Sequence, residues 1–222
     1  LRDARKRTWI LFAFASLGIQ LYGFWPSTPN HYYLYAYILV LLFLFDWESE
    51  EERDLCLSGL KWVFVTTIFY AGMKKVMMGT YFNGAFLAFN IQTHKFFQEF
   101  FSLILSQETI ETIRDFPFWE RKFRSPSAAL TFISNASYLL EIVPTLLLLF
   151  RKTRTWAVLF LVPVLLTVFV MARHIYFVLC CLMLLSLFVK KNHLKALLAL
   201  QIPILVYLLL AHIWRWPGTG WQ

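Results

Sequence analysis

The chain has 222 residues, of which 59% are hydrophobic, 19% aromatic and only 15% charged, and its mean hydropathy is +0.59. Soluble domains are nearer half apolar and a quarter charged, so this composition excludes a water-soluble globule, and the apolar content also excludes intrinsic disorder. Three cysteines in a chain of this length exclude a disulfide scaffold. We therefore predict an all-α, polytopic transmembrane helix bundle, with residues 1–222 forming one integral membrane domain.

Hydrophobic stretches, taken in chain order, predict about seven membrane spans. A helix needs roughly 20 residues to cross about 30 Å of hydrocarbon, so a chain of this length has room for roughly six to eight crossings and for no separate globular domain. The predicted spans are residues 8–25, 32–45, 57–77, 128–150, 155–172, 175–189 and 194–214.

The link between the third and fourth spans, residues 78–127, is the least hydrophobic part of the chain. Its central apolar residues recur at spacings of three and four, opposite polar ones. The apolar set is Phe96, Phe97, Phe100, Phe101 and Ile104, and the polar set is Lys95, Gln98, Glu99 and Ser102. This pattern predicts one amphipathic helix that lies in the membrane interface or caps the bundle.

Positive charge is concentrated in three basic knots beside hydrophobic segments. They are Arg2, Arg5, Lys6 and Arg7; Arg151, Lys152 and Arg154; and Lys190, Lys191 and Lys195. With seven spans, the positive-inside rule puts all three knots and the N-terminus in the cytoplasm, and the link 78–127 and the C-terminus outside. The formal charge of +8 is thus interpreted as a topology signal and not as a nucleic-acid site, with contact to anionic membrane lipid as the alternative.

Ionisable residues inside a predicted span are functional candidates by default because their burial in a membrane is costly. Lys74 and Lys75 are adjacent, so they point about 100° apart, and one can face lipid headgroups while the other faces the bundle. The alternative is that both simply end the span at the surface. Glu141 lies in mid-span and must be neutral or paired, either for function or as an interhelical hydrogen bond.

Histidines add to the titratable groups on the predicted external side. His31, His94 and His174 fall on that side together with the two lysines, and such a convergence would suit a pocket with proton chemistry. No pair of histidines, and no Glu-x-x-His pair, has the spacing that holds a metal on one helix face, so we expect no metal site.

Three motifs in order resemble the transmembrane (HTTM) domain of the vitamin K-dependent γ-carboxylase family. That family has an Asn-His-x-Tyr-Leu element opening one helix, a Tyr/Phe-x-Ala-Gly-x-Lys-Lys element ending the next, and a Leu-Leu-Asp stretch. The corresponding runs here are Asn30-His31-Tyr32-Tyr33-Leu34, Tyr70-Ala71-Gly72-Met73-Lys74-Lys75 followed by Gly79 to Gly84, and Leu139-Leu140-Glu141. The similarity covers about residues 11–189.

The resemblance implies a site for a quinol, either reduced vitamin K or another one. Lys75 matches the lysine that acts as base, Lys74 is its neighbour, and His31 would hydrogen-bond a quinone oxygen. His174 lies about one helical turn away from the family's late histidine, and Glu141 would support the site. The residues assigned to quinone binding are Asn30, Tyr33, Tyr70, Gly72 and Tyr81, although an interfacial aromatic belt is the other explanation for the tyrosines.

The activity implied is that of a carboxylase-like lyase or oxidoreductase: hydroquinone deprotonation and epoxidation, with coupling to carboxylation as a further step. Carboxylases of this family bind their protein substrate with a lumenal domain that follows the bundle. A separate soluble or membrane protein would therefore have to supply the substrate here. The alternative is a non-catalytic membrane partner, an assembly or immunity protein that shares the bundle fold.

Overall fold

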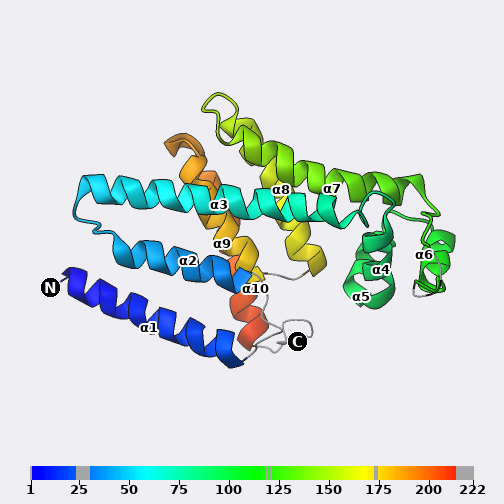
Figure 1. Cartoon of the computed structure of the whole chain (residues 1–222), viewed down its shortest axis with the longest axis horizontal. Helices are drawn as coiled ribbons and strands as arrows, with labels where there is room; N and C mark the ends of the chain where they lie inside the picture. The colour runs from blue at the N-terminus through cyan, green and yellow to red at the C-terminus, as the bar shows by residue number, and fades with distance from the viewer. Residues whose placement is uncertain (1, 24–30, 119, 121, 173–174, 214–222) are drawn as a thin grey trace. The chain divides into compact units, whose positions relative to one another are not determined.

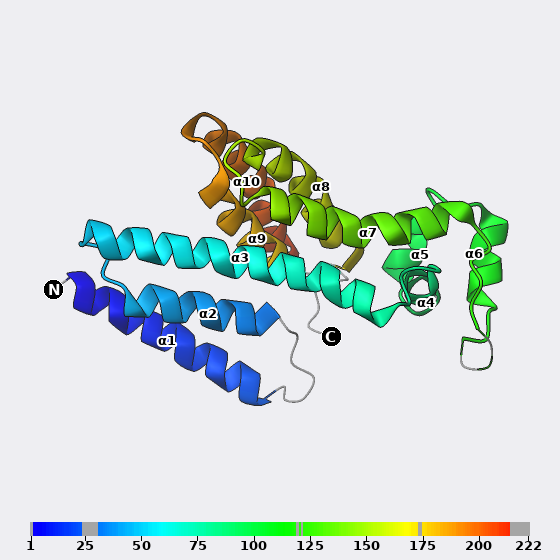
Figure 2. The same cartoon turned by 45° about the horizontal axis from the view of Figure 1, so that its top comes forward.

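The computed structural model describes residues 2–23, 31–118, 120, 122–172 and 175–213. Over these residues the chain is helical, without a described strand (Figure 1, Figure 2). In chain order the helices are α1 (Arg2–Gly23), α2 (His31–Leu44), α3 (Glu50–Met78), α4 (Ala85–Thr93), α5 (Lys95–Phe101), α6 (Gln107–Arg114), α7 (Ala128–Leu147), α8 (Arg154–Ala172), α9 (Ile175–Leu185), the 3-10 turn η1 (Ser186–Phe188) and α10 (Lys191–Ile213).

Each of the seven predicted spans corresponds to one helix. Within the described part of the chain, α3 and α7 are long and apolar enough to cross a membrane, judged by length and composition. Four further apolar stretches are shorter, namely Tyr32–Leu44, Arg154–Phe169, Tyr176–Phe188 and His193–Tyr207. The all-α prediction is therefore confirmed, while the number of membrane crossings stays a prediction.

The chain divides into two compact units, Leu1–Thr67 and Ile68–Gln222. In the first unit α1 and α2 pack side by side (Figure 1). At one end of this unit Lys6 Nζ donates to the Phe45 carbonyl at 3.4 Å and lies 5.3 Å from the centre of the Trp47 ring. At the start of α3 the Asp46 amide donates to Glu52 Oε2 at 2.6 Å. Polar contacts thus hold the α2–α3 link against the first basic knot.

The link 78–127 belongs to the second unit and contains three short helices instead of the single amphipathic helix predicted. Gly84, in the left-handed region with φ 76°, precedes α4. His94 is extended, with φ −123° and ψ 115°, and separates α4 from α5. Ser106 caps α6 by accepting a hydrogen bond from the Thr109 amide at 3.3 Å. These local breaks confine the helical spacing of the phenylalanines to α5 and end the helix before Ile104.

The three helices enclose a hydrophobic core of their own at the end of the unit where α7 begins (Figure 2). Its buried residues are Leu87, Ala88, Ile91, Phe101, Leu105, Ile110, Ile113, Phe123 and Leu130. Because α5 ends at Phe101, the chain turns, and Leu105 is buried while Ile104 remains 49% exposed. The predicted apolar face is therefore wrong at Ile104. The folded link fixes the α3–α4 turn beside α7.

Beyond the link, each helix from α7 to α10 packs against the next helix in the chain. The core between them is aliphatic and includes Leu161, Leu165, Val178 and Leu182. The connections are short, which suits helices that neighbour one another in sequence order.

Candidate functional site

The close approach of α3 to α7 within the second unit depends on Gly72. A Cβ atom at residue 72 would lie 2.6 Å from Ile142 Cγ1 and 3.2 Å from both Glu141 Cβ and the Tyr138 carbonyl oxygen. The 2.6 Å contact is too short for any side chain, so a residue other than glycine would force α7 or the Ile142 side chain to move. Small residues serve the same purpose at helix contacts in membranes. Gly72 therefore packs against α7.

An ion pair joins the two helices one turn beyond Gly72. Lys75 lies three residues after Gly72, on the same face of α3, and its Nζ is 2.5 Å from Glu141 Oε1. The Lys75 side chain is 21% exposed and that of Glu141 10%. Lys74 is exposed. The two adjacent lysines thus have different environments: one faces α7 and the other faces outward.

The aromatic ring of Tyr81 lies over the Lys75 ammonium of the ion pair. Tyr81 is 5% exposed, its ring centre lies 5.4 Å from Lys75 Nζ, and it stacks on Phe86 with 4.5 Å between ring centres. A lysine over an aromatic face gains about 1 to 2 kcal/mol when it is desolvated. Burial, and after it the charge of Glu141, raise the pKa of the Tyr81 phenol, so this hydroxyl stays protonated.

The turn that carries Tyr81 is fastened to α7 by hydrogen bonds. Gly79 and Gly84 have φ values of 70° and 76°, which allow the sharp turn after α3. The buried Ser134 Oγ donates to the Tyr81 carbonyl at 2.7 Å, and Asn135 Nδ2 donates to the Phe82 carbonyl at 3.2 Å. The ring above Lys75 is therefore held in place.

One oxygen of Glu141 is buried without a hydrogen-bond partner in the described part of the chain. Its Oε1 accepts from Lys75, whereas Oε2 is buried and has no hydrogen-bond partner among the described residues. Glu141 is also the last acidic residue in the sequence and the only charged residue of α7. A buried carboxylate oxygen without a donor is costly, and it is a natural acceptor for a proton from a ligand.

The chain matches no family model, no curated protein and no solved structure. The resemblance to γ-carboxylases accordingly stays a prediction that rests on the motifs.

Of the residues assigned to the site from the sequence, the structure brings four together: Gly72, Lys75, Tyr81 and Glu141.

The other assigned residues lie elsewhere or are not described. Tyr70 is 64% exposed on α3, four residues before Lys74 and on the same outward face. Tyr33 is 40% exposed in the first unit, and His31 begins α2 in that unit. Asn30 and His174 lie outside the described residues. Because Tyr70 is exposed on the outer face of α3, an interfacial aromatic belt explains this residue better than quinone binding does.

Sequence reasoning missed the residues that support the site from α7. Ser134 fastens the Tyr81 turn, Asn135 accepts from the Tyr138 hydroxyl at 2.7 Å, and Thr145 Oγ1 donates to the Glu141 carbonyl at 2.5 Å. The sequence spacing of these residues could have revealed them, because residues seven and four positions apart share a helix face. Ser134, Glu141 and Thr145 have those separations, and all three are buried.

Proposed function

We propose that this chain is a polytopic membrane protein in which Lys75 and Glu141 act as one acid–base unit that removes a proton from a bound quinol. The observation that carries the proposal is the buried ion pair in which Glu141 Oε2 has no partner within the described chain. The ring of Tyr81 lies over its Lys75. The seven-span topology, with this site in the outer half of the membrane, is part of the same proposal.

The pair can accept a proton by two routes with one outcome. In the ionised pair, Glu141 Oε2 accepts the proton directly. If the Lys75 proton first moves to Oε1, the neutral amine is the base, as the resemblance implies. Both routes end with a Lys75 ammonium and a neutral Glu141 carboxylic acid, because strongly coupled groups titrate as a unit. The ammonium then stabilises the negative charge left on the substrate oxygen.

The Lys75–Glu141 pair supports a quinol as the substrate, because it can take a proton from an acidic hydroxyl group. A reduced naphthoquinone, when bound, supplies an acidic hydroxyl group and the electrons for reaction with oxygen. Glu141 Oε2 would accept a hydrogen bond from that hydroxyl. Carboxylation of a glutamate is the further step that the resemblance implies, and a partner protein would have to present that glutamate.

The test is oxidation and epoxidation of reduced vitamin K by the purified protein in lipid vesicles. We expect Lys75→Ala to abolish turnover. Lys74→Ala makes the same change in charge at the neighbouring exposed position, and we expect it to leave turnover nearly intact. Equal turnover in wild type and Lys75→Ala would overturn the assignment.

The second candidate is a non-catalytic membrane partner in which the pair only joins α3 to α7. The direct contact between the two charges, next to the packing glycine, favours it. The double variant Lys75→Met/Glu141→Leu separates the two candidates, since a buried pair can often be replaced by apolar residues without loss of stability. If the pair is only structural, the double variant should fold and function like the wild-type protein. If the pair transfers a proton, the double variant should fold but be inactive.

A further inference from the structure

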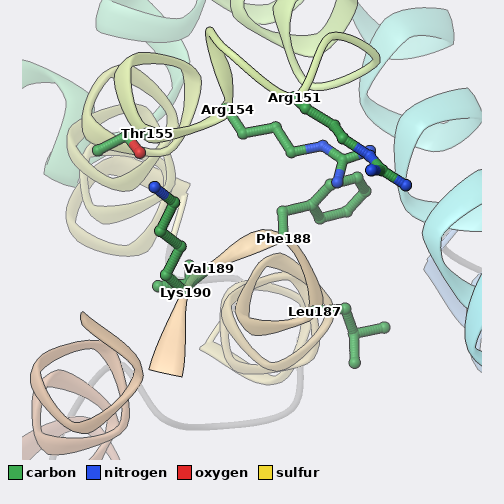
Figure 3. Close-up of a pocket in the computed structure, with 7 residues that line it drawn as sticks. All are labelled: Arg151, Arg154, Thr155, Leu187, Phe188, Val189 and Lys190. Atoms are coloured by element: carbon green, nitrogen blue, oxygen red, sulfur yellow. The ribbon is translucent and has the colours of Figure 1, made fainter. Parts of the chain in front are cut away.

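A cavity of about 260 Å³ lies in the second unit, where the α7–α8 connection meets the η1–α10 connection. Arg151, Arg154, Thr155 and Lys190 contribute its polar lining, and Phe188 contributes a ring (Figure 3). Three basic residues from two separate basic knots therefore surround one cavity.

The structure orients Arg154 before any ligand arrives. Its Nε donates to the Leu148 carbonyl at 2.9 Å, and its guanidinium carbon lies 5.8 Å from the centre of the Phe188 ring. Thr153 Oγ1 fixes the connection by donating to the Leu147 carbonyl at 2.7 Å. The hydrogen bond uses Nε, so the two terminal nitrogens remain for a planar or tetrahedral anion.

No acidic residue of the neighbouring sequence neutralises these charges. Residues 142–222 contain eight lysines and arginines and no aspartate or glutamate, so they carry the whole formal charge of +8. The residues described as lining the cavity likewise include no acid. Three cations around one cavity repel each other, and an anion between them would offset that repulsion.

An exposed apolar stripe begins beside the cavity. Trp156, Leu159 and Phe160 are all exposed on the first turns of α8, directly after Thr155. Their spacing of three and four places them on one face. A ligand with an anionic head and apolar tails would match both surfaces, and arginine forks and a hydroxyl are typical donors to phosphate oxygens.

We propose that this cavity binds the phosphate headgroup of an anionic phospholipid, whose acyl chains lie along the apolar stripe of α8. The topology predicted from the basic knots puts the cavity on the cytoplasmic side, where anionic lipids attract basic protein segments. A free phosphate compound shares the headgroup chemistry but makes no use of the stripe.

The test is native mass spectrometry of the delipidated protein titrated with phosphatidylglycerol or with phosphatidylcholine. We expect one phosphatidylglycerol to bind more tightly than phosphatidylcholine. Arg151→Gln should weaken its binding about tenfold, since it removes a charge-assisted contact. Lys152→Gln, an exposed neighbour with the same loss of charge that does not line the cavity, should weaken it less than about twofold.

A second matched pair keeps the proposal falsifiable if Arg151→Gln does not fold. Lys190→Gln should behave like Arg151→Gln, and Lys195→Gln, exposed and outside the cavity, should behave like Lys152→Gln. If the two variants of each pair weakened phosphatidylglycerol binding equally, the proposal would be overturned in favour of a diffuse basic surface. Displacement of phosphatidylglycerol by equimolar glycerol 3-phosphate or inorganic phosphate would overturn the lipid source and assign a soluble ligand.

Discussion

Substitution of Gly72 by alanine should disturb the site without touching its chemical groups. The new Cβ would lie 2.6 Å from Ile142 Cγ1, whereas ordinary contact begins at 3.4 Å, so α3 and α7 must separate by about 0.8 Å or Ile142 must shift. The Tyr138 carbonyl at 3.2 Å restricts the same movement from the backbone side. Overpacking of this kind costs about 1 to 3 kcal/mol, offset by up to about 1 kcal/mol of helix propensity.

We therefore expect Gly72→Ala to lower the free energy of unfolding in detergent by about 1 kcal/mol. The effect on quinol turnover should be larger, about 100-fold, because a displacement near 1 Å at a reacting group can cost that much. Gly18→Ala is the matched control: no atom lies within 4 Å of its added Cβ, so stability should rise slightly and turnover should not change. A Gly72→Ala protein as stable and as active as wild type would refute the packing role of this glycine.

Three further predictions concern the same site. Lys75→Met should destabilise the protein by about 3 kcal/mol, because it leaves Glu141 buried without its partner, while Lys74→Met should change the unfolding free energy by less than about 0.5 kcal/mol; equal effects would contradict the pairing. Ser134→Ala should cost about 1 to 2 kcal/mol in chemical unfolding, since the Tyr81 carbonyl loses its buried donor, and a neutral result would contradict that contact. The raised pKa of the Tyr81 phenol means that the unfolded chain loses its proton first, so stability should fall as pH rises above about 10; Tyr81→Phe should flatten that fall in pH-dependent unfolding, and an unchanged slope would contradict it.

The helical segments could be predicted from the sequence because long apolar runs determine them, whatever lies around them. Their ends could not. The third span was expected from residue 57, but α3 begins at Glu50. Three glutamates occupy its first turn, where acidic side chains stabilise the helix N-terminus, so the helix extends beyond its apolar part. Hydropathy alone does not register such polar extensions.

The contacts between segments that are distant in the sequence are the main feature that the sequence does not predict. The sequence singles out Lys75 and Glu141 separately by their cost in a membrane, yet they are 66 positions apart, and no local pattern connects them. Gly72 was assigned to quinone binding from its motif, whereas its contact with Ile142 shows a packing role. The prediction for the link 78–127 is wrong for the same reason: its buried apolar residues come from α4 through α6 and from the segment after α6, and they pack against one another.

Infrared difference spectroscopy of the protein in vesicles tests most directly whether the Lys75–Glu141 pair takes up a proton from the quinol. The pair begins ionised and ends with a neutral Glu141, so adding reduced vitamin K should produce a protonated carboxylic acid band. That band should be absent with the oxidised quinone and in Glu141→Gln. A spectrum without the band, or a band that persists in Glu141→Gln, would contradict the account.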